Sequence, residues 1–209
     1  LTRTGGLAAA ALTLSLGLAA CGGEEEPTSG SDNTTQSEEP TQEDTEMEED
    51  ASAQTYGAGC AQVPTSGAGS FDGMVTEPVA SAASANPLLK TLVAAVTEAQ
   101  LVEPLNSAPA LTVFAPADPA FEAIPPKDME AVMADKKMLG GILTHHVVGE
   151  QIAPDQLSGE FETLNGDMLT INGSGEQATI GDEKAQVLCG NIKTANATVY
   201  VIDTVMMPS

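Results

Sequence analysis

The chain has 209 residues, enough for one domain or at most two small ones, and its 30 acidic and 7 basic residues give a formal net charge of −23. A chain with this charge repels phosphate, so a nucleic-acid partner is disfavoured. Anionic lipid headgroups would be repelled as well, so any association with a membrane requires a covalent or hydrophobic anchor.

An export signal is predicted at the start of the sequence. Arg3 precedes an apolar run over residues 7–20, which is shorter than the roughly 20 residues of a membrane span but typical of a signal peptide. The run ends in Leu-Ala-Ala-Cys, the form of a lipobox. We therefore expect residues 1–20 to be a lipoprotein signal peptide, and lipid on Cys21 to hold the protein on the outer face of the cell membrane. An ordinary signal peptide followed by an incidental cysteine is the alternative.

Residues 21–54 are predicted to be a disordered acidic linker that begins with the lipidated cysteine. From Glu24 to Asp50 there are 12 acidic residues and no Lys or Arg. A segment with almost no apolar residues cannot bury enough surface to offset the entropy lost on ordering. A cation-binding or glycosylated stalk is an alternative that no residue spacing selects.

Residues 55–75 are interpreted as a lead-in that carries Cys60, and residues 76–209 as the folded domain. Once Cys21 is assigned to lipid, the three cysteines leave the pair Cys60 and Cys189. Outside the cytosol this pair can persist as a disulfide. Two free buried thiols are the alternative. A metal site is less favoured, because neither cysteine lies in a C-x-x-C pair or near a histidine in sequence.

Helices are predicted in the first half of the domain, where N-capping residues and prolines precede apolar residues at helical spacing. The expected elements are helices that start at Thr76, Asn86 and Asp118, a short buried strand over residues 111–114, and one helix over residues 128–143. In this interpretation Asp118 is the N-cap of its own helix.

Strands are predicted after Val148, where turn residues separate short apolar runs. Asn165-Gly166 predicts a two-residue hairpin with a type I′ turn, because both residue types readily adopt positive φ. The expected strands cover residues 168–172, 178–180, 185–188, 190–194 and 198–205. Helices first and a β meander last indicate an α+β domain.

Three segments together resemble the fasciclin (FAS1) family. They are LTVFAPADPAF at residues 111–121, LTHHVV at residues 143–148 and ATVYVIDTVMMP at residues 197–208, in the family's order and spacing. The sequence is similar in particular to the mycobacterial secreted and lipid-anchored members, which also pair an early cysteine with a late one. The resemblance implies a single β-wedge of twisted antiparallel sheets, with helices in its N-terminal half.

The candidate binding residues are His145, His146 and Asp203. His145 stands where the family usually has Tyr, so the Tyr-His pair discussed for integrin binding in the family is not present as a pair. We expect His146 to be buried with a backbone partner. The sequence leaves the burial of His145 open; if exposed, this side chain would titrate near physiological pH. We expect Asp203 to be satisfied by local backbone at the end of a strand.

No catalytic residue, metal site or cofactor is predicted. The two histidines of the sequence are adjacent, so they do not converge on one face of a regular element. No nucleophile elbow, H-E-x-x-H or P-loop motif occurs. The chain is therefore predicted not to be an enzyme.

The resemblance implies adhesion, so the expected function is binding of a surface or extracellular-matrix macromolecule by a cell-surface lipoprotein. The alternative is a carrier of a small apolar ligand or lipid at the cell envelope. A closed apolar cavity of a few hundred Å³ would favour the carrier, whereas a packed core with an exposed apolar patch would favour the adhesive module.

Overall fold

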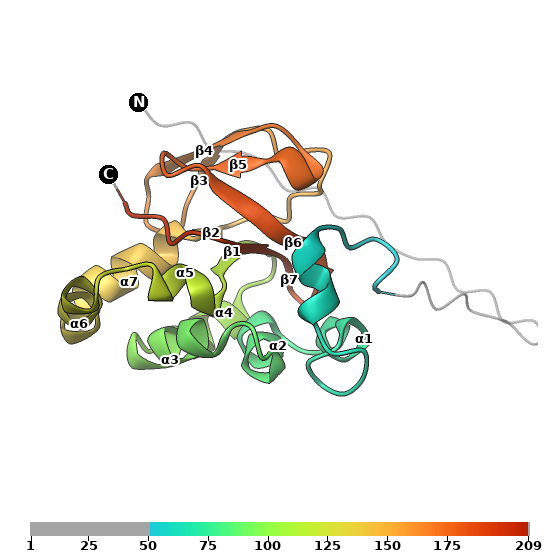
Figure 1. Ribbon diagram of the computed structural model, residues 1–209, viewed down its shortest axis with the longest axis horizontal. Helices are drawn as coiled ribbons and strands as arrows, with labels where there is room; N and C mark the ends of the chain where they lie inside the picture. Colours follow the sequence, from blue (N-terminus) through green and yellow to red (C-terminus); the bar gives the residue numbers. More distant parts are fainter. Residues whose placement is uncertain (1–50, 209) are drawn as a thin grey trace, which may run out of the picture. The chain divides into compact units, whose positions relative to one another are not determined.

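A computed structural model describes residues 51–208 of the chain (Figure 1). The predicted signal peptide, Cys21 and the predicted linker up to residue 50 lie outside the described residues. The described helices are η1 (Ala58–Gln62), α1 (Phe71–Val75), α2 (Val79–Ala85), α3 (Lys90–Glu98), α4 (Val102–Ser107), α5 (Asp118–Glu122), α6 (Pro126–Ala134), α7 (Lys136–His145) and η2 (Gly175–Gln177). The described strands are β1 (Leu111–Pro116), β2 (Val147–Val148), β3 (Gly159–Glu162), β4 (Met168–Asn172), β5 (Thr179–Ile180), β6 (Ala185–Lys193) and β7 (Ala197–Ile202).

The strands of this part of the chain form one sheet in the order β2-β1-β7-β6-β5-β4-β3. The predicted α+β wedge with helices in its N-terminal half is confirmed, but the sheet is mixed rather than antiparallel throughout. Strands β1 and β7 run parallel, with Leu111 opposite Ala197 and Pro116 opposite Ile202. These two strands are buried along their whole length, as expected for strands covered on both faces.

The two ends of the sheet meet, which gives the wedge its curvature. Thr163, directly after β3, forms a bridge with Val148 in β2, and the Leu164 amide donates to the Val147 carbonyl at 2.7 Å. Sequence periodicity gave no sign of this contact, because β2 has only two residues and β3 is largely exposed. The contact places the β3–β4 hairpin beside the C-terminal end of α7.

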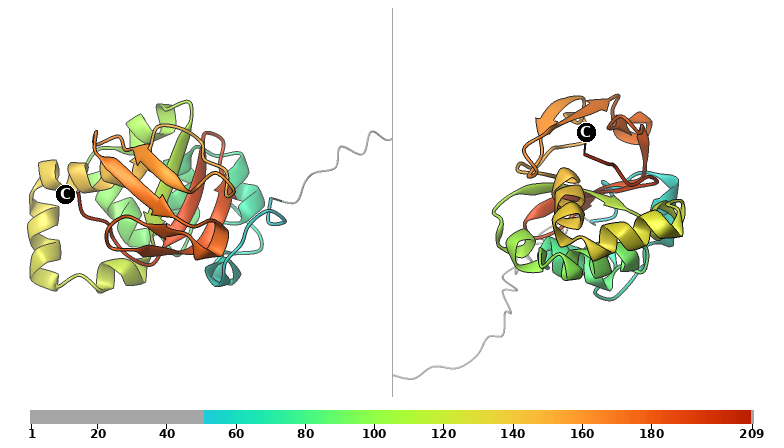
Figure 2. Two further views of the ribbon diagram at one scale, coloured as in Figure 1. Left: turned by 90° about the horizontal axis from the view of Figure 1, so that it is seen from above. Right: turned by 90° about the vertical axis from the view of Figure 1, so that its left-hand side faces the viewer.

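The sheet separates two hydrophobic clusters. Helices α1–α7 cover one face of β1, β7 and β6, and strands β3–β5 fold over the other face (Figures 1 and 2). Phe114 and Tyr200, on adjacent strands, are stacked in the second cluster with ring centroids 5.7 Å apart. Val113 and Val199, from the same two strands, belong to the first cluster.

Several predicted helix boundaries were wrong. Thr76 ends α1, and the next helix begins three residues later, after Pro78. Asp118 caps a different helix from the one predicted: it lies in the first turn of α5, and its carboxylate accepts from the Thr91 amide in α3 at 2.8 Å. The predicted helix over residues 128–143 is two helices. The extended backbone at Asp135 separates them, and its carboxylate caps α7 through the Lys137 and Met138 amides.

The strands also differ from the prediction in detail. The β3–β4 hairpin is confirmed, but its turn is not type I′: only Gly166 has positive φ, and its amide donates to the Thr163 carbonyl. Two predicted strands at residues 185–188 and 190–194 are the single strand β6, with register shifts on both sides of Cys189. Within this irregular stretch Gly190 makes room for Tyr56, because a Cβ there would lie 2.4 Å from the Tyr56 ring.

The lead-in is bound to the sheet covalently. Cys60 and Cys189 form the predicted disulfide, with Cα atoms 4.8 Å apart. Tyr56 bridges Gly190, and the Gln54 carbonyl accepts from the Asn191 side chain at 3.0 Å. Gln54, the last residue of the predicted linker, therefore already contacts the folded domain. In the described range, no helix is both long and apolar enough to cross a membrane.

Candidate functional site

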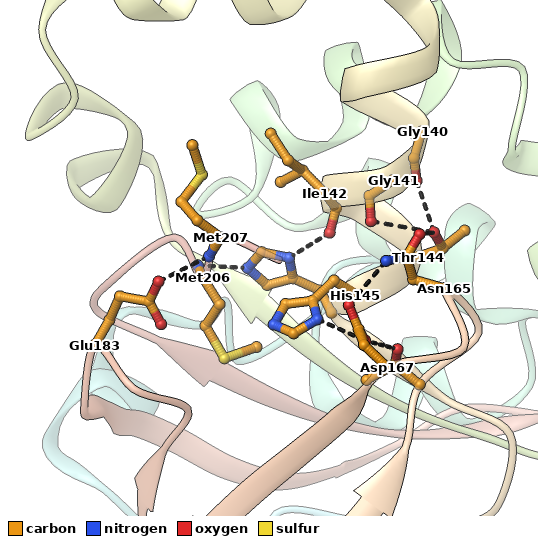
Figure 3. A network of polar contacts seen from close by, with 12 residues as sticks. Gly140, Gly141, Ile142, Thr144, His145, Asn165, Asp167, Glu183, Met206 and Met207 are labelled. Carbon is orange, nitrogen blue, oxygen red and sulfur yellow. Dashed lines mark hydrogen bonds and ion pairs between the residues drawn. The ribbon is translucent and has the colours of Figure 1, made fainter. Parts of the chain in front are cut away.

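His146 lies at the junction between α7 and β2 and is 2% exposed. Its Nδ1 is 2.8 Å from the Ile142 carbonyl oxygen, and its Nε2 is 2.9 Å from the Met206 amide nitrogen (Figure 3). A carbonyl can only accept and an amide N–H can only donate, so Nδ1 carries the proton and Nε2 accepts. Burial is the main cause that lowers the pKa of His146 from its ordinary 6.5 to about 4, and His145 lowers it further. The ring is therefore neutral at pH 7. The prediction of a buried His146 with a backbone partner is confirmed.

His145 is 5% exposed, so it is buried as well, and the question that the sequence left open is answered. It ends α7 and points toward the β3–β4 turn, where its Nδ1 lies 2.8 Å from Asp167 Oδ1 (Figure 3). Thr163 donates its hydroxyl to the same carboxylate oxygen, and Asn165 donates to Oδ2 at 2.8 Å. Burial acts to raise the pKa of Asp167, but the hydrogen bonds from Thr163, Asn165 and His145 together lower it from 3.8 to about 2. We call these four residues the hairpin latch, because they fasten the hairpin to α7.

Asp203 lies apart from the histidines, at the end of β7. Its Oδ1 accepts from the Gln186 amide at 2.8 Å and from the Thr204 hydroxyl at 2.9 Å. The prediction of a strand-end residue with a backbone partner is confirmed, but this partner, Gln186, lies 17 residues away on the neighbouring strand rather than locally. The structure thus brings His145 and His146 together and leaves Asp203 separate, and all three make internal contacts. Their part in binding stays a prediction.

Sequence reasoning missed most partners of the histidines. Asp167 and Asn165 were considered only as turn residues, although a turn rich in Asn and Asp is a common source of side-chain hydrogen bonds. Glu183 was not considered at all, yet it accepts from the Met207 amide at 2.9 Å and fixes the C-terminal segment beside Met206. No cluster of three or more His, Cys, Asp or Glu side chains that could hold a metal ion occurs among residues 51–208.

Two small apolar hollows flank His146. The α4 hollow is lined by residues such as Val93, Val102 and Leu105, and the α6 hollow by residues such as Met129, Val132 and Met207. Each encloses about 50 Å³, and Leu143 and His146 line both. Two larger hollows, of about 260 and 440 Å³, have polar groups in their linings, including Asp72 in the first and Glu150 in the second.

Comparisons with known proteins give consistent results. Residues 87–208 match the family model described as Fasciclin domain. The sequence is 42% identical to the cell surface glycolipoprotein MPT83 of Mycobacterium tuberculosis over 168 residues, which are 76% of this chain and 74% of the relative. It is also 42% identical to the immunogenic protein MPB70 of Mycobacterium bovis, covering 76% of this chain and 84% of that one.

More distant matches also exist. Protein sll1483 of Synechocystis is 37% identical over 62% of this chain and 73% of its own length. A solved FAS1 domain pair from the insect cell adhesion molecule Fasciclin I is 21% identical. That match covers 57% of this chain and 45% of the solved chain, with a TM-score of 0.48.

Proposed function

Because the chain belongs to the fasciclin family, we propose that its folded domain is a non-enzymatic module that is presented at the cell surface and binds a macromolecule there. The observation that carries the proposal is the 42% identity, over three quarters of the chain, to a relative named as a cell surface glycolipoprotein. The predicted lipid on Cys21 would anchor the module to the outer face of the membrane. The acidic residues that follow Cys21 would keep it away from anionic headgroups.

The β3–β4 hairpin is the contact surface that the structure favours. Leu164, in the turn, and Met168, the first residue of β4, are 49% and 57% exposed. Large apolar side chains at such exposure suit a protein–protein contact. The hairpin latch holds the turn against α7, so the surface is ordered before a partner arrives, which reduces the entropy lost on binding. In this proposal His145 positions the contact surface rather than touching the partner.

The alternatives find less support in the geometry. Both nitrogens of His146 are engaged by backbone groups, which argues against a role for this ring in proton transfer. A carrier that encloses a whole lipid needs a cavity of several hundred Å³. The two apolar hollows that flank His146 enclose about 50 Å³ each. A binding module therefore fits the domain better than an enzyme or a carrier of whole lipids.

Anchoring is tested with a Cys21→Ala variant in the native host. We expect the wild-type protein to be labelled by an impermeant reagent on intact cells and to remain in the membrane fraction. The variant should lack the lipid by mass spectrometry and should leave that fraction. A wild-type protein protected from the reagent on intact cells would contradict the surface location.

The contact surface is tested by photo-crosslinking the protein on intact cells to partners on the cell surface or in the material around the cells. A photoreactive residue at position 164 or 168 should give the same discrete product, identified by mass spectrometry. The same photoreactive residue in place of the exposed Asn172, at the other end of β4, should not give this product. Equal products from all three positions would show that the hairpin turn is not the contact surface.

A further inference from the structure

We propose that the α6 hollow is a binding site for the end of a single alkyl chain. The hollow lies between α6 and the body of the domain, and α6 runs along the outside of the molecule (Figures 1 and 2). Its walls come from α3, α5, α6, α7 and the C-terminal segment. The site is independent of the proposed surface contact, since the β3–β4 hairpin contributes no residue to it.

The outer wall of the hollow is the apolar side of α6. Met129, Val132 and Met133 have the spacing i, i+3, i+4 and therefore share one face of the helix. All three are half-buried and line the hollow, while no residue of α6 is fully buried. Pro125 and Asp135, both in non-helical conformation, join the helix to its neighbours. The packing of α6 against the domain thus depends on side chains that border an empty space.

The opposite wall is fixed by the hydrogen bonds of His146. Because both ring nitrogens are engaged by Ile142 and Met206, the ring presents only carbon to the hollow. The same hydrogen bond to Met206, together with that from the Met207 amide to Glu183, holds the C-terminal segment in place. Val205 and Met207 of this segment complete the wall. The rigid side of the site is therefore built from backbone contacts, and the adaptable side from methionines.

The chemistry of the lining selects the ligand. The surface that faces the hollow is entirely apolar, so it offers no partner to a buried N–H, C=O or hydroxyl. A peptide segment would bring such groups with it and would leave them unsatisfied, whereas an alkyl chain brings none. A volume of about 50 Å³ corresponds to roughly four water-sized groups at about 10–15 Å³ each, and hence to about four methylenes. Apolar cavities of this kind stay free of water, so the chain displaces nothing.

The test uses straight-chain alcohols from ethanol to hexan-1-ol with the full-length protein. Each further methylene should raise affinity about fourfold up to about four buried carbons, and the gain should level off for longer chains. The methionine methyl groups, labelled with ¹³C, report the location: Met129, Met133 and Met207 should shift on titration. Met74 and Met168, which do not line the hollow, should not shift. Hexane-1,6-diol, which would bury a hydroxyl, should bind at least tenfold more weakly than hexan-1-ol.

Two matched variants separate this site from the neighbouring hollow. Val132→Phe fills the α6 hollow from an exposed helix, and Val93→Phe fills the α4 hollow, where Val93 is also half-buried. We expect Val132→Phe to weaken hexan-1-ol binding at least tenfold and Val93→Phe to leave it unchanged. Thermal melts confirm that each variant is folded. The proposal would be overturned if affinity for the alcohols did not depend on chain length, or if a folded Val132→Phe variant bound hexan-1-ol with wild-type affinity. Neither outcome would affect the proposed surface function.

Discussion

Single side chains with two backbone partners hold separate segments of this domain together. His146 joins the fourth-last residue of α7 to the C-terminal segment, which is 60 positions away in sequence. Thr112 does the same on β1: its hydroxyl donates to the Glu150 carbonyl at 2.6 Å and accepts from the Ile152 amide at 2.8 Å. Buried groups with full hydrogen bonding stabilise one arrangement, because removing either partner leaves the other unsatisfied.

The stability of the domain should fall in mildly acidic solution because of His146. Its folded-state pKa of about 4 lies below its ordinary 6.5, so the unfolded chain takes up this proton first as the pH falls. The contribution of His146 to the free energy of unfolding is complete above pH 6.5. It is lost between pH 6.5 and 4, at about 1.4 kcal/mol per pH unit and about 3 kcal/mol in all. Urea unfolding at half-unit pH steps measures it.

Asp167 overlaps this measurement only at its acidic end, because its lowered pKa begins to reduce stability below about pH 5. A His146→Gln variant serves as the control. It should be less stable than the wild type at pH 7 and should lack most of the slope between pH 6.5 and 4. A wild-type free energy of unfolding that is flat across this range would show that the ring is not held neutral.

At the scale of elements, Asn196 in the β6–β7 turn fastens two helices to the sheet. Its Oδ1 accepts from the Val79 amide at the start of α2, at 2.9 Å. Its Nδ2 donates to the carbonyls of Leu105 and Ala108 at the end of α4, at 2.8 and 2.9 Å. One side chain thus supplies both an acceptor to a helix N-terminus and donors to a helix C-terminus, where backbone groups lack intrahelical partners.

Asn196→Ala should therefore lower the free energy of unfolding by about 2–3 kcal/mol, because it leaves partly buried N–H and C=O groups without partners. Chemical denaturation of the purified variant measures the loss. Asn172→Ala, at an exposed position in β4, is the matched control and should change stability by less than about 0.5 kcal/mol. Equal effects in the two variants would show that the contacts of Asn196 contribute nothing specific.

Local sequence signals predicted elements better than their boundaries. The position of the Asn-Gly hairpin, the cysteine pair and the burial of His146 were predicted correctly, since each follows from a short-range pattern or a count. The type of the turn was not. The break between α6 and α7 at Asp135 was missed, because the Asp135 carboxylate caps α7 only once the backbone has left the helical conformation. The latch around Asp167 was missed for a different reason: its partner His145 is 22 residues away, and periodicity says nothing about such contacts.

The molecule as a whole is organised around the parallel pair β1 and β7. The chain between them forms the remaining strands and helices α5–α7, so the pair can form only when most of the chain has been made. Because the bridge between Val148 and Thr163 closes the sheet, little open strand edge remains. The short free edge at β3 carries Glu160 and Glu162, which discourage edge-to-edge association. Neither the parallel pairing nor the closure was predicted, since both depend on contacts between distant segments.

Removing the disulfide should destabilise the whole domain. The bond closes a separation of 129 residues, for which the chain-entropy relation gives about 4–5 kcal/mol. A Cys60→Ala/Cys189→Ala double variant should unfold at lower denaturant concentration. Its m-value should be larger, since the unfolded chain is no longer constrained. A double variant as stable as the wild type would mean that the lead-in alone fixes β6. The unfolding curve of the oxidised wild type at the same pH is the reference for both quantities.

The position of this bond also determines how the domain responds to mechanical force. Any pull on the chain upstream of Cys60 passes through the sulfur atoms directly into β6, near the middle of the sheet. The force therefore does not have to travel through residues 61–75, so the rest of the lead-in and α1 are not peeled away one by one. Strand β6 is held along its length by β7, so the load is shared by many hydrogen bonds at once. A module that is tethered at its N-terminal end and grips a partner elsewhere would resist shear at that tether.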